Sequence, residues 1–62
     1  MSDMTRQLEL RDLQQGDEFR VVGDKKKTVF VFDHLDGMYS LNYRKSDRKI
    51  AHFKHWTPVE KI

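Results

Sequence analysis

The chain has 62 residues, no cysteine and 35% charged residues, with a formal net charge of only +2. So short a chain predicts a single domain over residues 1–62 with a small core, which excludes large substrate cavities, disulfides and thiolate metal sites. No apolar run approaches the roughly 20 residues of a membrane span and no signal peptide is visible, so we expect a cytoplasmic protein.

Turn signals such as Gly16-Asp17, Gly23-Asp24 and Asp36-Gly37 recur along the chain, at a spacing typical of small all-β folds. Residues 1–5 are expected to be disordered, and a short helical turn is possible near residues 11–15. Between the turns, stretches rich in Val, Phe, Tyr and Thr favour strands. The predicted strands, in chain order, cover residues 18–22, 28–35, 38–44, 49–55 and 59–62, and residues 7–10 could add a short strand before them.

Asp36-Gly37 is a strong hairpin signal, which we interpret as the two central residues of a type I′ turn. That turn pairs Leu35 with Met38 and His34 with Tyr39. Paired residues share a face of the sheet because side chains alternate along a strand. The predicted core face of the hairpin consists of Phe30, Phe32, His34, Tyr39, Leu41 and Tyr43. The other face is mixed in character and carries Asp33, Ser40 and Asn42 among others.

A Ser46-Asp47 turn that continues this register places Tyr43 opposite Ile50 and Leu41 opposite His52, with Ala51 and Phe53 on the mixed face. A bulge in the third strand of this meander would reverse its faces. The predicted core consists of Leu13, Phe19, Val21, Phe30, Phe32, Leu41, Ile50 and Trp56, together with either Tyr43 or Phe53.

These elements predict a five-stranded SH3-like small β-barrel. The stretch from Leu13 to Phe19, Leu-Gln-Gln-Gly-Asp-Glu-Phe, resembles the Leu-x-x-Gly-Asp-x-hydrophobic approach to the first long strand of many SH3-like barrels. A second resemblance covers roughly residues 13–60. The string Phe-Asp-His-Leu-Asp-Gly-Met-Tyr-Ser at residues 32–40, followed by His52 and by Trp-Thr-Pro-Val-Glu at 56–60, is similar to small uncharacterised proteins of tailed bacteriophages and prophages. This resemblance implies a phage origin, an SH3-like fold and the host cytoplasm, and it implies no activity.

Catalytic and metal-binding interpretations find little support in the sequence. Asp33 and Ser40 are predicted on one face of the hairpin and His34 on the other, so they cannot converge as an acid, base and nucleophile must. His52 and His55 are three residues apart, a spacing that diverges on a strand and would suit a metal only on a helix. We therefore expect a binding protein that is not an enzyme, with no metal and no cofactor.

The distribution of charge is the most informative functional signal. Residues 1–18 carry a net charge of −3, whereas residues 19–62 carry +5. Basic turns beside exposed aromatic rings are typical of small barrels that bind single-stranded nucleic acid, and Tyr39 and Trp56 are further candidate rings. The predicted nucleic-acid site consists of Lys25, Lys26, Lys27, Arg44, Lys45, Arg48, Lys49, Lys54, Tyr43 and Phe53.

Two other interpretations stay open. Charged turns can serve solubility alone. The protein can also be a phage-encoded interaction module that modulates a host protein, with the acidic N-terminal segment and a Leu35/Met38 tip as its contact surfaces.

Overall fold

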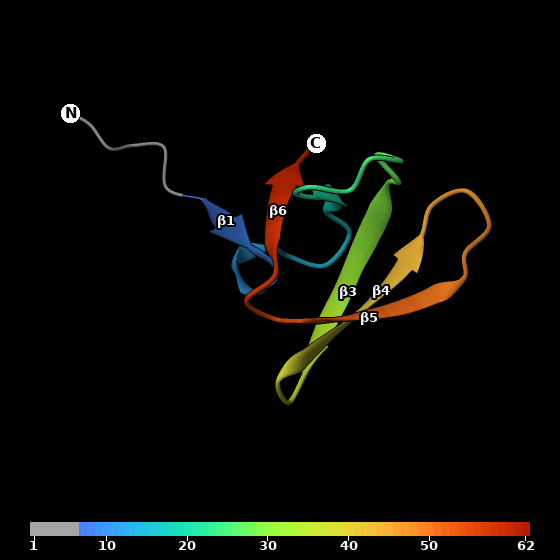
Figure 1. Ribbon diagram of the computed structural model, residues 1–62. Helices are drawn as coiled ribbons and strands as arrows, with labels where there is room; N and C mark the ends of the chain where they lie inside the picture. The colour runs from blue at the N-terminus through green and yellow to red at the C-terminus, as the bar shows by residue number, and fades with distance from the viewer. Residues whose placement is uncertain (1–6) are drawn as a thin grey trace.

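The computed structural model describes residues 7–62, which form one antiparallel sheet with the strand order β1-β6-β2-β3-β4-β5 (Figure 1). The predicted disorder of residues 1–5 lies outside the described residues. A three-residue 3₁₀ helix, Leu10–Asp12, follows the first strand where a helical turn was predicted near residues 11–15. The strands are β1 (Leu8–Glu9), β2 (Glu18–Val21), β3 (Phe30–Asp36), β4 (Tyr39–Arg44), β5 (Ile50–Lys54) and β6 (Pro58–Lys61).

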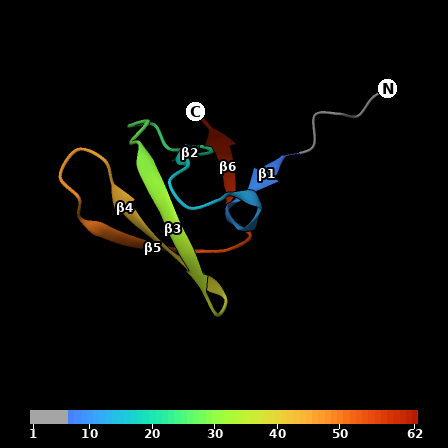
Figure 2. The ribbon, with the colours of Figure 1, turned by 180° about the vertical axis from the view of Figure 1, so that it is seen from behind.

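The all-β class is confirmed, but the sheet has six strands instead of five and is not a closed barrel, because β1 and β5 are its two free edges. Figures 1 and 2 show that β5 leads back toward β6, so that the two halves of the sheet face each other. Two backbone bonds, from Leu10 N to Thr57 O (3.1 Å) and from Arg11 N to His55 O (3.0 Å), extend the β1–β6 pairing into the segment that connects β5 to β6. The described residues include no helix long and apolar enough to cross a membrane.

The predicted register of the β3–β4 hairpin is wrong. Asp36 pairs with Tyr39, so the central turn residues are Gly37 and Met38 instead of Asp36 and Gly37. Gly37 has a φ of 63°, and neither Asp36 nor Met38 has a positive φ. This pattern matches a type II′ turn, which needs glycine only at its first central position, whereas a type I′ turn needs positive φ at both.

A bulge then changes the register again, between Phe32 and His34. Asp33 is the extra residue, so that Phe32 lies opposite Asn42 while His34 lies opposite Leu41. The two faces predicted for the hairpin are therefore wrong. Phe30 and Phe32 share the core face with Ser40, Asn42 and Arg44, and the opposite face carries Tyr39, Leu41, Tyr43, Val31 and His34.

The core is smaller than predicted and lies nearer the chain ends. Its buried members are Leu10, Leu13, Phe19, Phe32 and Val59, with Leu8, Val21, Phe30 and Phe53 partly buried against them. Phe30 stacks on Phe19 with 5.7 Å between the ring centroids, and the edge of one ring of the Phe30–Phe53 pair meets the face of the other at 5.1 Å. Leu10 and Val59 were not predicted.

Three predicted core residues lie elsewhere. Leu41 is half-buried on the outer face, and the exposed fractions of Ile50 and Trp56 are 58% and 45%. The predicted pairs Tyr43–Ile50 and Leu41–His52 are confirmed, with Ala51 and Phe53 on the face of Ser40. These pairs lie on the outer face because the bulge at Asp33 reverses which face of β4 lies beside Phe30 and Phe32.

The core face of β4 carries two polar residues, Ser40 and Asn42, where apolar residues were expected. Both side chains are fully buried. Ser40 Oγ donates to the carbonyl of Phe53 (3.0 Å), and Asn42 Nδ2 donates to Ser40 Oγ (2.9 Å) and to the carbonyl of Ala51 (3.2 Å). Both residues thereby bind β4 to β5, and these hydrogen bonds offset the cost of burying the Ser40 hydroxyl and the Asn42 NH₂ group, whereas the buried Asn42 Oδ1 has no hydrogen-bond partner among the described residues.

Candidate nucleic-acid interface

Two basic segments lie together at one end of the sheet. They are the β2–β3 loop with Lys25–Lys27 and the β4–β5 turn with Arg44–Lys49, both at the upper right of Figure 1. A backbone bond from Lys45 N to Val29 O (2.9 Å) joins the two segments. We call this region the basic end, and it comprises Lys25, Lys26, Lys27, Arg44, Lys45, Arg48 and Lys49.

The β2–β3 loop is organised by Asp24. Its carboxylate accepts hydrogen bonds from Lys26 N (3.1 Å) and Thr28 N (3.2 Å), and its carbonyl accepts one from Lys27 N (3.1 Å). Lys27 adopts a left-handed conformation with φ of 53°. Asp24 favours such local bonds to the following backbone, as aspartate commonly does in turns. The loop therefore holds three lysines in a defined shape even though it is highly charged.

The β4–β5 turn follows the same plan around Asp47. This carboxylate accepts bonds from Arg44 Nε (2.9 Å), from an Arg44 guanidinium NH₂ group (2.5 Å) and from Lys49 N (3.2 Å). Arg48 is left-handed, with φ of 63°. The hydrogen bond from the Arg44 guanidinium, with help from Lys49 N, lowers the pKa of Asp47 to about 2, and the same pair raises the pKa of Arg44.

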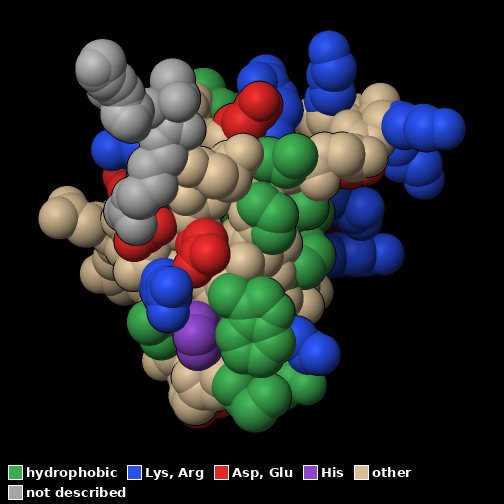
Figure 3. All heavy atoms as spheres, turned by 60° about the vertical axis from the view of Figure 1, so that its left-hand side comes forward, with side chains coloured by type: hydrophobic (Ala, Val, Ile, Leu, Met, Phe, Trp, Pro, Cys, Tyr) green, Lys and Arg blue, Asp and Glu red, His purple; other side chains and the backbone are tan. Residues whose placement is uncertain are grey.

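Ion pairs divide the basic end into engaged and available cations. Arg44 is held by Asp47, and Lys45 Nζ lies 2.8 Å from a Glu18 carboxylate oxygen. Within residues 7–62, no carboxylate lies within 4.0 Å of the cationic groups of Lys25, Lys26, Lys27, Arg48 and Lys49. Figure 3 shows Lys and Arg side chains along the upper and right-hand margin of one view, beside a band of hydrophobic side chains.

The other three predicted site residues lie apart from this end or differ in role. Tyr43 is on the outer face next to the turn, with the Arg48 guanidinium 5.8 Å from its ring centroid. Phe53 faces the core and packs on Phe30, so its ring helps to stabilise the fold. Lys54 lies at the far end of β5, with its ammonium group 5.5 Å from the centroid of the exposed Trp56 ring.

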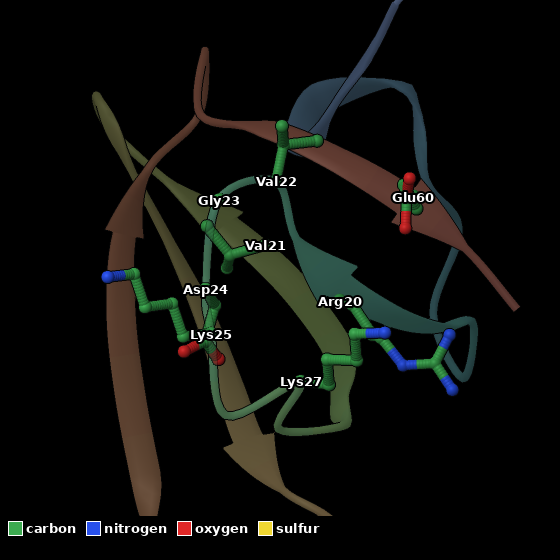
Figure 4. Close-up of a pocket in the computed structure, with 8 residues that line it drawn as sticks. All are labelled: Arg20, Val21, Val22, Gly23, Asp24, Lys25, Lys27 and Glu60. Carbon is green, nitrogen blue, oxygen red and sulfur yellow. The ribbon is translucent and has the colours of Figure 1, made fainter.

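Sequence reasoning missed Arg20. This residue lines a hollow of about 510 Å³ between β2, the β2–β3 loop and β6, together with Lys25, Lys27 and Glu60 (Figure 4). In that view Arg20 and Lys27 extend to the same side of the loop, while Lys25 points the other way. The sequence did carry a signal for this position. Side chains alternate along a strand, so Arg20 must share one face of β2 with Glu18. Arg20 thus adds a cation beside the lysine loop.

The residues considered for catalysis do not converge. Asp33 and His34 are hydrogen-bonded to each other, Oδ2 to Nδ1, at 2.5 Å, whereas Ser40 is buried on the core face. His34 lies opposite Leu41, so its predicted pairing with Tyr39 is wrong, and the bulge at Asp33 interrupts the alternation that was expected to place Asp33 and His34 on opposite faces. The hydrogen bond to His34, and one from Gln15, lower the pKa of Asp33. Across residues 7–62, no three His, Asp or Glu residues gather in a metal-binding arrangement.

Comparison with known proteins gives no match for this chain among protein families, curated proteins or solved structures. The resemblance to phage proteins and to SH3-like barrels therefore stays a prediction.

Proposed function

We propose that the protein binds nucleic acid through the basic end. The observation that supports this proposal most is that two separate basic segments, each shaped by one aspartate, lie side by side and present cations that no carboxylate of residues 7–62 pairs with. Such clusters attract the phosphate backbone and bind it independently of sequence. This proposal requires binding alone and no chemical step at the site.

The experiment is a titration of fluorescently labelled 15-mer DNA, single-stranded and duplex, at salt concentrations from 50 to 200 mM. We expect the logarithm of the affinity to fall linearly with the logarithm of the salt concentration, by about 0.7 to 0.9 for each phosphate contact. Absence of binding to either DNA at the lowest salt would contradict the proposal.

Matched variants assign the contacts. Lys26→Gln and Lys49→Gln should each weaken binding several-fold and lower the salt slope by about 1. Arg11→Gln, which removes the same charge from the 3₁₀ helix, is the control and should change neither. Lys45→Gln should have a smaller effect than Lys49→Gln, because Lys45 is already paired with Glu18. Equal effects of Arg11→Gln and Lys49→Gln would show that binding depends on the net charge of the protein and not on the position of the cation.

A second candidate, a protein-interaction module for a host protein, is favoured by one observation. The hydrogen-bond pattern of β4 with β5, fixed by Arg44 N to Lys49 O and His55 N to Met38 O, turns the backbone groups of Ile50 and His52 toward the free edge. Such an edge accepts an added strand. His52→Pro would remove the outward N–H and should abolish capture of a host protein from lysate that the unaltered chain captures.

We also propose that the fold is an open variant of the SH3-like barrel. The curled sheet, the 3₁₀ turn and the approach to β2 through Gly16-Asp17 support it. An experimental structure whose strands do not superpose on SH3-like barrels would contradict this assignment.

A further inference from the structure

The outer face of β4 and β5 carries an aromatic row, which is exposed at Tyr39 and half-buried at Leu41 and Tyr43. Tyr39, Leu41 and Tyr43 follow one another along β4, opposite Lys54, His52 and Ile50 on β5. The exposed fractions of Tyr39 and Ile50 are 44% and 58%. The two tyrosines are four residues apart, or about 13 Å along a strand, which corresponds to roughly four nucleotides at the 3.4 Å rise of a stacked strand.

The two borders of this face differ in charge. On the β3 side lie Asp33 and Asp36, and Asp36 pairs directly with Tyr39. On the β5 side Lys54 lies at one end and Arg48-Lys49 at the other, where the face joins the basic end. A polyanion on this face would therefore run along the β5 border, away from the two aspartates.

The cations also lie close to the rings. The Arg48 guanidinium is 5.8 Å from the centroid of Tyr43, and the Lys54 ammonium is 5.5 Å from that of Trp56. A nucleotide has the matching arrangement, because its flat base and its phosphate are separated by one sugar. Tyrosine rings accept any base by stacking, and a nearby arginine or lysine holds the adjoining phosphate.

We propose that this face binds single-stranded nucleic acid, with bases stacked on Tyr43 and Tyr39 and with phosphates along the β5 border from Arg48 to Lys54. The inference rests on the proposed function and narrows it to unpaired strands. In a duplex the bases are stacked on one another and their faces cannot reach the tyrosine rings, so a duplex would use the basic end alone.

The experiment compares dT15 with a 15-base-pair duplex on the full chain and on Tyr39→Leu and Tyr43→Leu. Each leucine variant should bind dT15 about tenfold more weakly, as expected for the loss of one stacking ring, and should bind the duplex unchanged. The salt slope should stay the same because no charge is lost. Tyr39→Phe and Tyr43→Phe keep the ring, so they should bind dT15 within about twofold of the unaltered chain.

The outcomes separate this inference from the proposed function. If Lys26→Gln weakens binding while both leucine variants bind dT15 normally, the stacking face is wrong and the basic end stands. If the leucine variants weaken dT15 and duplex equally, the rings act through the fold or through Arg48, and the inference is also wrong. If neither probe binds, both proposals fail. Should Tyr43→Leu fail to fold, the more exposed Tyr39 decides the result.

Discussion

The two faces of β4 are opposite in character to what their side chains would indicate. The core face carries the polar residues Ser40 and Asn42, both fully buried, and the outer face carries Tyr39, Leu41 and Tyr43, of which Tyr39 is 44% exposed. The buried polar groups bind carbonyls of β5, while the outer rings have Arg48 and Lys54 near them. Polarity alone is therefore a poor guide to burial in a domain whose sheet is held by side-chain hydrogen bonds.

The largest expected effect comes from placing the same charge on each face. Asn42→Asp puts a carboxylate against the carbonyl of Ala51 and the hydroxyl of Ser40, and we expect it to lower the free energy of unfolding by about 3 to 5 kcal/mol. Leu41→Asp, one residue along, should cost less than about 1.5 kcal/mol. Urea denaturation at pH 7 measures both, and equal costs would show that the assignment of the faces is wrong.

A smaller contrast is expected on β5, whose residues alternate in the same way. Phe53→Ala removes a ring that packs on Phe30 and should cost about 2 to 3 kcal/mol. Ile50→Ala, on the exposed outer face, should cost less than about 1 kcal/mol. Thermal unfolding followed by circular dichroism gives the comparison. A larger loss from Ile50→Ala would place the core on the other side of the strand.

The pairing of β3 with β4 next to their connection depends on the turn at Gly37. Because its φ is 63°, Gly37→Ala should destabilise the hairpin by roughly 1 to 2 kcal/mol. The same substitution with D-alanine, made by peptide synthesis, should recover this loss because D-residues favour positive φ. If L-alanine were tolerated without cost, Gly37 could not be the first central residue of a type II′ turn.

The smallest expected effect is the pH dependence of the β4–β5 turn. The pKa of Asp47 is lowered from 3.8 to about 2 by its bond to Arg44, so the ionised form stabilises the folded state. This stabilisation is complete above pH 3.8 and is lost as the pH falls through about 2. An NMR titration of the Asp47 carboxyl carbon should show this midpoint. In Asp47→Asn the stability should vary less with pH over the same window, and an unchanged dependence would contradict the pair.

The sequence predicted the strands well because alternation and turn residues are local signals. It failed at the faces of the hairpin because of the bulge at Asp33, which shifts the pairing by one residue so that Phe32 lies opposite Asn42. The bulge could not be foreseen because no residue such as a left-handed glycine marks it, whereas the change of turn alone leaves every residue on its predicted face. Leu10 and Val59 entered the core through the pairing of the chain ends, which is a long-range property.

The candidate site was predictable in part for the same reasons. Basic residues in turns are visible in a sequence, so the cations of both loops were identified. Their meeting at one end depends on the bond from Lys45 N to Val29 O, and the burial of Phe53 depends on the register of β4. Which cations are available follows from the ion pairs of Lys45 and Arg44, which only the folded chain defines.

One measurement tests the central claim most directly, namely backbone amide NMR shifts of the ¹⁵N-labelled protein during titration with dT15 at low salt. The account predicts that the largest shifts fall on residues 25–27 and 43–49, with further shifts at Tyr39 and Lys54. The hairpin tip at Gly37 and the 3₁₀ helix should be little affected. Shifts confined to the tip or to the 3₁₀ helix, or no shifts at all, would contradict it.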